Sequence, residues 1–346
     1  MLIVMGTRPE AIKLAPVVAA LRRRGAEAAI CTTGQHPDLL PPALADFGFV
    51  ADHQLAWNGD WRASLPPLQM LVRELKPQGV IVQGDTFSAL AGGMAARLEG
   101  VPLHHVEAGL RSGDVFSPFP EEICRTGLGR IADTHFTPTA SATDALLREG
   151  VATGSIHRVG NTIVDALRMR LRSLNRHAPA GIDARRKLVL LTVHRRESVG
   201  EGTRAILRAA VRIAADPEVQ LIYPVHPRTR GEELEALGSG HAVQLVEPLP
   251  YAEFLPLLAR AALVLTDSGG IQEEAAVLGT PLVCLRSVTE RPEALDRPQA
   301  RLCGTDQEAI VSAASELLAQ RPDRRPSAAF GDGNAADRIA EILLPD

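Results

Sequence analysis

The segment Thr266–Pro281 (TDSGGIQEEAAVLGTP) carries the residue types of an anion-binding turn. It follows the apolar run Ala261–Leu265, which predicts a buried strand, and it continues with apolar residues at helical spacing. Ser268, Gly269 and Gly270 therefore fill a strand-to-helix turn. Glycines let the backbone approach a ligand closely, and the free N–H groups of a new helix attract an anion. This chemistry suits a phosphate, and a purely structural turn is the alternative.

Ionisable side chains recur where other predicted strands end. In an open α/β sheet such positions face one crevice, and several of these side chains are cations suited to a diphosphate. The first half supplies Arg8, Lys13, Gln35, His36, Asp85, Glu107 and Arg111, and the second supplies His194-Arg195-Arg196-Glu197, His226 and Ser268-Gly269-Gly270. Together they predict one polar cleft.

Simpler structural roles remain open for some of these groups. Asp85 would serve as the N-cap of the following helix, and Glu121 and Glu122 would complement a helix dipole. His194 would serve as a hydrogen-bonded core residue. Glu107 has no such role, because it interrupts an apolar strand end next to Ala-Gly. No histidine spacing typical of a metal site occurs, so we expect no metal.

Alternating strands and helices must position these groups. Short apolar runs predict strands at Leu2–Met5, Ala28–Thr32, Gly79–Gln83, Val101–Val106, Leu188–Val193, Val219–Val225, Ala242–Val246, Ala261–Leu265 and Pro281–Leu285. Helical patterns lie between them, and such alternation predicts parallel, right-handed α/β sheets. The expected fold class is α/β, with two Rossmann-like, doubly wound parallel-sheet domains and an interdomain cleft.

The predicted boundaries follow a polar stretch in which apolar periodicity fades. Residues 1–171 form the N-terminal domain, 172–187 the linker and 188–330 the C-terminal domain. We expect a last helix within 331–346 to pack on the N-terminal domain, with packing on the C-terminal domain as the alternative. A chain of 346 residues is long for one core, which also favours two domains.

Composition excludes several classes of protein. The formal charge is −4, from 37 Lys and Arg against 41 Asp and Glu, so nothing favours nucleic acid. No run of about 18 apolar residues predicts a membrane span, and no signal peptide is evident. The four cysteines form no CxxC pair, which favours reduced thiols and a cytoplasmic location.

Eight motifs are distributed over nearly the whole chain. They are GTRPEAIK (6–13), GDT (84–86), HVEAGLR (105–111), PFPEE (118–122), HRRE (194–197), YPVH (223–226), DSGGIQEE (267–274) and TERPE (289–293). In these motifs and in their order, the chain resembles the non-hydrolysing UDP-N-acetylglucosamine 2-epimerases.

The resemblance implies a glycosyltransferase-B-like fold and a homodimer acting on a UDP-sugar. It implies interconversion of UDP-N-acetylglucosamine (UDP-GlcNAc) and UDP-N-acetylmannosamine (UDP-ManNAc) without a metal or redox cofactor. The route is anti elimination of UDP to 2-acetamidoglucal, followed by re-addition. Acid–base groups on both faces of sugar C2 and cations for the departing diphosphate serve this chemistry.

The resemblance also implies site residues. The catalytic set is Asp85, Glu107, Glu121 and His194, with Arg125 nearby. The groups that bind substrate and UDP are Arg8, Lys13, His226, Phe254, Ser268, Gly269, Gly270, Glu274 and Arg291, with Phe254 at the uracil and Glu274 at the ribose. Gln35 and His36 match a loop that holds a second, activating UDP-GlcNAc in some members.

Departures from the family pattern leave alternatives open. Gln83 replaces the usual histidine before Gly-Asp-Thr, and Val193 replaces the usual glycine before His-Arg-Arg-Glu. The segments HPRTR (226–230) and GDGNA (331–335) look more like relatives acting on other UDP-acetamido sugars. The alternatives are a hydrolysing 2-epimerase that releases free N-acetylmannosamine (ManNAc) and UDP, an epimerase for another UDP-acetamido sugar, and a UDP-sugar glycosyltransferase.

Overall fold

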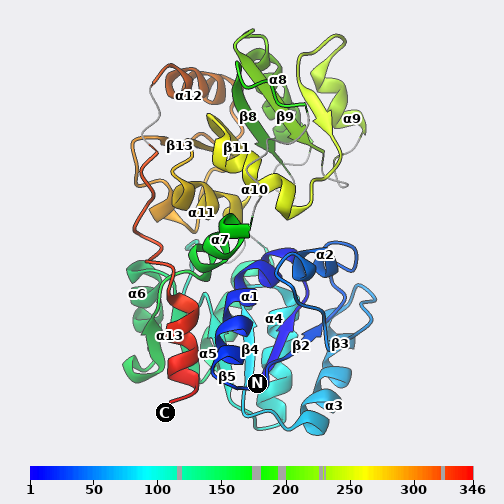
Figure 1. Ribbon diagram of the computed structural model, residues 1–346, viewed down its shortest axis with the longest axis vertical. Coiled ribbons are helices and arrows are strands. Elements are labelled where there is room, and N and C mark those ends of the chain that lie inside the picture. The colour runs from blue at the N-terminus through cyan, green and yellow to red at the C-terminus, as the bar shows by residue number, and fades with distance from the viewer. Residues whose placement is uncertain are drawn as a thin grey trace. The chain divides into compact units, whose positions relative to one another are not determined.

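The computed structural model describes residues 1–114, 119–173, 181–193, 200–225, 229, 231–320 and 324–345. The chain divides into two compact units. Unit 1 contains Met1–Ser173 and Phe330–Asp346, and unit 2 contains Leu174–Ala329. Each unit is a parallel sheet covered by helices (Figure 1).

Unit 1 has seven strands among its described residues, in the order β3-β2-β1-β4-β5-β6-β7. They are β1 (Leu2–Met5), β2 (Ala29–Thr32), β3 (His53–Gln54), β4 (Val80–Gln83), β5 (Leu103–Val106), β6 (Thr134–Thr137) and β7 (Ile156–Arg158). All pair in parallel. From β1 the chain winds out to β2 and β3, then returns to β4 and winds the other way. The strand order therefore reverses between β1 and β4, which is the point where open α/β sheets bind ligands.

Helices cover both faces of this sheet. They are α1 (Arg8–Arg23), α2 (Leu40–Ala45), α3 (Leu65–Leu75), α4 (Phe87–Leu98), α5 (Glu121–Ile131), α6 (Ala140–Arg148), α7 (Thr162–Ser173) and α13 (Ala335–Leu343). Alternate residues of β1 serve opposite faces. Ile3 and Met5 belong to the apolar cluster of α1 and α13, whereas Leu2 and Val4 belong to that of α3 and α4. Helices α1 and α4 thus lie on opposite faces.

The C-terminal helix α13 belongs to unit 1 and runs beside α1 (Figure 1). Its buried side contributes Ala336, Ile339 and Ala340 to the same apolar cluster as α1. On its exposed side, Asp337 pairs with Arg23, the last residue of α1, and Glu341 pairs with Arg24, the next residue. Burial of the apolar side, rather than these exposed ion pairs, supplies most of the stabilisation.

Unit 2 repeats the plan with six strands in its described part, in the order β10-β9-β8-β11-β12-β13. They are β8 (Lys187–Thr192), β9 (Val219–Pro224), β10 (Gln244–Val246), β11 (Leu263–Thr266), β12 (Leu282–Cys284) and β13 (Ala300–Leu302). The helices are α8 (Glu201–Ala214), α9 (Gly231–Leu234), α10 (Tyr251–Arg260), α11 (Gly269–Leu278) and α12 (Gln307–Ala319). Here the strand order reverses between β8 and β11. The Thr192 and Thr266 hydroxyls, at the ends of those strands, lie 2.6 Å apart.

The structure confirms the predicted α/β class with two doubly wound parallel sheets. The bounds of the nine predicted strands differ from the observed ones by one or two residues at most positions, as expected where strand ends fray. Four further strands, β3, β6, β7 and β13, were not predicted by range. No helix in the described residues is long and apolar enough to cross a membrane.

Candidate active site

Two neighbouring turns define the carboxyl edge of unit 1 at its point of strand reversal. Gly6-Thr7 links β1 to α1, and Gly84-Asp85-Thr86 links β4 to α4. Arg8 is the first residue of α1, and Lys13 lies on the same helix, where its side chain is buried. The structure therefore assembles the predicted cations and Asp85 on adjacent strand ends.

Glu107 directly follows β5 and is held by two donors on one oxygen. The Nζ atom of Lys13 donates to Oε2 of Glu107 at 2.6 Å, and the side-chain amide of Gln83 donates to the same oxygen. All three side chains are buried. Glu107 has a φ of +62°, in the left-handed region that non-glycine residues seldom adopt. Such local strain is typical of functional positions, because the surrounding contacts must maintain it.

Asp85 is held by a second cation. The Arg125 guanidinium, on α5, pairs with Asp85 and donates to Oε2 of Glu122 at 2.8 Å. Thr86, not Asp85, caps α4, since its hydroxyl accepts from the Ala89 N–H. The capping interpretation of Asp85 is therefore wrong, and its carboxylate is directed to Arg125 instead.

Glu121 and Glu122 both lie in the first turn of α5, as the dipole interpretation requires. Glu122 is buried and has a further use, because the Ser112 N–H donates to its carboxylate at 3.3 Å. It thus anchors Arg125 to the segment after β5. Glu121 is half-buried at the start of the same helix.

His105, on β5, supports the Gly84–Asp85 turn. Its Nε2 lies 2.7 Å from the Gly84 carbonyl oxygen. Because a carbonyl only accepts, this nitrogen carries the hydrogen. Burial lowers the pKa of His105 to about 4, so the ring is neutral near pH 7. No role was predicted for His105, although it lies two residues before Glu107 in the sequence.

Glu10 is a second residue that sequence reasoning missed. Its carboxylate is 1% exposed and accepts from the Gly6 and Thr7 N–H groups and from the Thr7 and Thr86 hydroxyls. Burial raises its pKa to about 7, while these hydrogen bonds act in the opposite direction. The Thr7-x-x-Glu10 spacing in the sequence is typical of a capping box, and it could have indicated this contact.

The predicted loop residues Gln35 and His36 lie against the same edge. The Ser88 hydroxyl, on α4, donates to Oε1 of Gln35 at 2.6 Å and also lies 2.7 Å from the Thr33 hydroxyl. The His36 N–H donates to the Gly6 carbonyl at 2.8 Å. This loop is thereby tied to both turns of the strand-reversal point.

In unit 2, the predicted anion turn lies at the corresponding point of strand reversal. Ser268 occupies the N-cap position of α11 but makes no side-chain capping hydrogen bond, so capping does not account for its hydroxyl. A Cβ on Gly269 would lie 2.7 Å from Cζ of Arg291, whereas one on Gly270 would meet nothing within 4 Å. Arg291 thus packs over the first turn of α11. Guanidinium and helix N–H donors converge there, as an anion requires.

Arg291 is held in a buried network of alternating charge. Its Nε donates to Glu273 Oε1 at 2.6 Å, and its guanidinium also pairs with Glu290. Arg286 donates to the other oxygen of Glu290 at 2.6 Å. These paired charges hold the Arg291 guanidinium in one orientation beside α11.

Other predicted residues fall elsewhere. Phe254 on α10 is 4% exposed and belongs to the apolar core beneath α10 and α11. Glu274 is buried on α11. Arg111 makes a two-point ion pair with Glu149, at the end of α6, so the structure directs it away from the other predicted groups. His194 and His226 lie outside the described residues.

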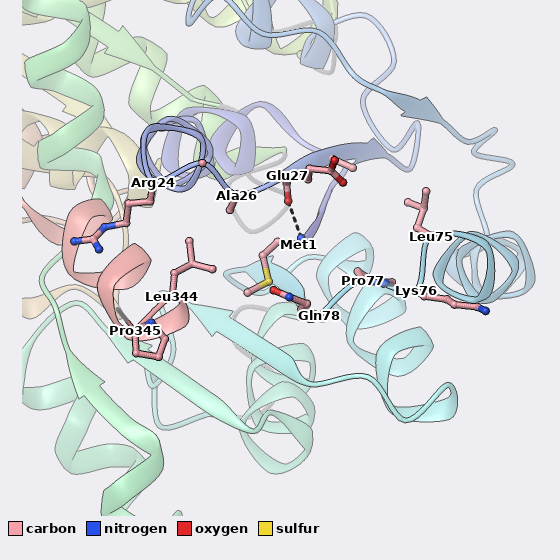
Figure 2. Close-up of a pocket in the computed structure, with 12 residues that line it drawn as sticks. Met1, Arg24, Ala26, Glu27, Leu75, Lys76, Pro77, Gln78, Leu344 and Pro345 are labelled. Atoms are coloured by element: carbon pink, nitrogen blue, oxygen red, sulfur yellow. Dashed lines mark hydrogen bonds between the residues drawn. The ribbon is translucent and has the colours of Figure 1, made fainter.

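A hollow of about 780 Å³ lies at the opposite edge of the unit 1 sheet (Figure 2). It is lined by residues that precede strands, among them Met1, Ala26 and Gln78, and by Leu344 of the C-terminal segment. The Met1 nitrogen donates to the Glu27 carbonyl there at 2.8 Å. None of the predicted site residues lines it, and ligands of open α/β sheets bind at the carboxyl edge.

In the described part of the chain, no group of three or more His, Cys, Asp or Glu side chains could hold a metal.

The two doubly wound sheets, with acid–cation pairs at one carboxyl edge and an anion turn at the other, define an enzyme of the glycosyltransferase-B-like class. A family model described as UDP-N-acetylglucosamine 2-epimerase matches residues 19–344. The chain belongs to that family.

Individual relatives cover almost the whole chain. The UDP-N-acetylglucosamine 2-epimerase of Escherichia coli K12 is 42% identical over 366 residues, covering 99% of this chain and 97% of the relative. A crystal structure of the Neisseria meningitidis UDP-GlcNAc 2-epimerase bound to UDP-GlcNAc matches with a TM-score of 0.94 at 34% identity, covering 100% and 99% of the two chains. The Methanocaldococcus jannaschii enzyme, in complex with UDP-GlcNAc and UDP, matches with a TM-score of 0.89 at 34% identity, covering 99% and 98%.

Proposed function

We propose that this protein interconverts UDP-GlcNAc and UDP-ManNAc by eliminating UDP from the sugar and adding it back. One observation carries the proposal. Asp85 and Glu107, at the ends of the adjacent strands β4 and β5, are each paired with a buried cation, Arg125 and Lys13. The substrate follows from the relatives that bind UDP-GlcNAc.

The chemistry explains why several carboxylates are needed. The proton on sugar C2 is not α to a carbonyl, so a side chain can remove it only with the help of UDP leaving C1. Anti elimination gives 2-acetamidoglucal and UDP. Protonation of C2 on its other face, with return of the diphosphate, gives the epimer. Two carboxylates on different strands can serve the two faces, with Asp85, Glu107 and Glu121 as the candidates.

The leaving diphosphate needs positive charge that persists after the C1–O bond breaks. We assign this role in unit 1 to Arg8 and Lys13, with His194 as a further group. In unit 2 we assign it to Ser268 and the first amides of α11, beside Arg291. Glu274 and Phe254 are the proposed ribose and uracil contacts, and His226 completes the substrate set. No cofactor is required by this route.

Proton NMR in D2O tests the reaction. The protein is incubated with UDP-GlcNAc, and the sugar C2 position is followed. We expect deuterium at C2 in a mixture of UDP-GlcNAc and UDP-ManNAc. Accumulation of free ManNAc would establish the hydrolysing alternative. Absence of exchange at C2 would reject both and leave a glycosyltransferase or an epimerase for another UDP-acetamido sugar.

Substitution of the acid–base groups is the matching test. Asp85→Asn and Glu107→Gln keep the side-chain shape but remove the base, so each should abolish turnover while UDP still binds. Turnover is measured by the NMR assay and UDP affinity by titration calorimetry. Near-normal turnover in both variants would contradict the assignment.

We further propose that the enzyme acts as a homodimer in a reducing cytoplasm. An apolar hollow of about 540 Å³ on unit 1 is lined by Trp61, Phe87, Leu90, Phe119 and Ile123, among others. Two of these, Phe119 and Ile123, are exposed in the single chain. Exposed apolar patches of this kind are typical of subunit contacts. The four free cysteines suit a reducing compartment.

A further inference from the structure

Glu10 does more than cap its own helix. Its Oε2 accepts from the Gly6 N–H at 2.9 Å, the Thr7 N–H at 2.7 Å and the Thr7 hydroxyl at 2.8 Å. These bonds form a capping box at the start of α1. All three donors belong to the turn that leads from β1 to Arg8.

The other oxygen reaches a different turn. Oε1 of Glu10 accepts from the Thr86 hydroxyl at 2.7 Å, across 76 residues of sequence. Thr86 is the N-cap of α4 and follows Asp85 directly. Since α1 and α4 lie on opposite faces of the sheet, this carboxylate joins the two helix starts across the point where the strand order reverses.

The bridge uses both oxygens of one buried side chain. Oε2 accepts from the turn between β1 and α1, and Oε1 accepts from the turn between β4 and α4, so the side chain needs two polar atoms to join the two turns. Burial raises the pKa of Glu10 to about 7, while the hydrogen bonds from Gly6, Thr7 and Thr86 act in the opposite direction. The chain therefore keeps an ionisable group in a buried position, where it serves two turns at once.

We propose that Glu10 is a positioning residue for the epimerase reaction, holding the Asp85–Thr86 turn against the turn that carries Arg8. This inference rests on the proposed function. Glu10 does not touch the reacting atoms. It fixes the carboxylate of Asp85 relative to the cationic turn, and a displacement of about 1 Å between such groups is enough to lower turnover severely.

Kinetics of four single variants and one double variant test the proposal by the same NMR assay. Glu10→Ala removes the bridge from one side, and Thr86→Val removes the hydroxyl from the other side. Thr86→Ser restores that hydroxyl. Thr139→Val is the matched control, because Thr139 likewise caps a unit 1 helix, α6, through its hydroxyl, yet has no bond to Glu10.

We expect Glu10→Ala and Thr86→Val each to lower kcat about tenfold or more, with KM changed less than about threefold. The double variant should be no slower than Glu10→Ala, because the bond between Glu10 and Thr86 is already absent there. Thr86→Ser should recover most of the turnover. Losses no larger than that of Thr139→Val, or losses that multiply in the double variant, would overturn the proposal. Failure of the wild type to exchange C2 would instead reject the proposed function.

Discussion

The two donors on Glu107 give Gln83 a measurable role. Hydrogen bonds to a charged group are worth roughly 1.5–3 kcal/mol, so losing one should lower turnover about 10- to 100-fold. We therefore expect Gln83→Leu, which keeps the buried volume but removes the donor to Glu107, to lower kcat by that factor with little change in KM. Steady-state kinetics at neutral pH check this.

Gln83→His is the control for that substitution. It retains a donor and should keep most of the turnover. Full activity in Gln83→Leu would show that Glu107 keeps its orientation without the Gln83 amide.

Glu10 also predicts how stability varies with pH. Its pKa rises from the ordinary 4.5 to about 7 on folding, so the folded state binds the proton more tightly. The associated stability is fully present below about pH 4.5 and is lost as pH rises through about 7, on the order of 3 kcal/mol in all. Glu10→Gln cannot titrate, so it should remove this pH-dependent loss of unfolding free energy.

Urea unfolding of wild type and Glu10→Gln at about pH 5 and about pH 8 measures the effect. Burial lowers the pKa of His104 and His105 to about 4, which makes stability rise with pH over much of the same range. These histidines are common to both proteins, so their contribution cancels in the difference. A difference in unfolding free energy that does not change with pH would contradict the interpretation.

Helix α11 offers a matched pair of glycines. In Gly269→Ala the new Cβ would overlap the Arg291 guanidinium, which is fixed by Glu273 and Glu290. We expect a loss of about 2–3 kcal/mol of unfolding free energy. Gly270→Ala meets open space and should change stability by less than about 1 kcal/mol. Chemical denaturation checks both, and equal effects would mean that Arg291 moves freely.

At the scale of elements, the sequence predicted the strands and turns whose signal lies within a few neighbouring residues. Fully apolar runs such as that of β1 and the glycine turn before α11 carry strong local signals. The edge strand β13 (Ala300–Leu302) carries none, because it has three residues and its apolar Leu302 is exposed. Its strand state comes from pairing with β12, which is a tertiary effect.

The site was predicted as residue types but not as contacts. Asp85, Glu107 and Arg125 were expected to lie near one another, yet nothing local pairs Lys13 with Glu107 or directs Arg111 to Glu149. Which side chains form these pairs depends on which strands become neighbours in the sheet. The left-handed backbone of Glu107 is likewise imposed by its surroundings rather than by its own preference.

At the scale of the whole molecule, the apolar hollow on unit 1 adjoins the proposed catalytic turns. Phe87 opens α4 one residue after Thr86, and Phe119 and Pro120 lead directly to Glu121. A second chain covering this hollow would bury exposed apolar surface and restrain both turns at once. Loss of the dimer should therefore reduce turnover as well as association.

Ile123→Asp tests this, since a charge at a buried subunit contact is strongly unfavourable. Light scattering should show wild type at twice the chain mass of 37.0 kDa and the variant at the chain mass. Its kcat should fall because the restraint on Asp85 and Glu121 is lost. Val50→Asp is the control, because Val50 is 78% exposed but does not line the hollow. A dimer that persists in Ile123→Asp would place any subunit contact on another face of the chain.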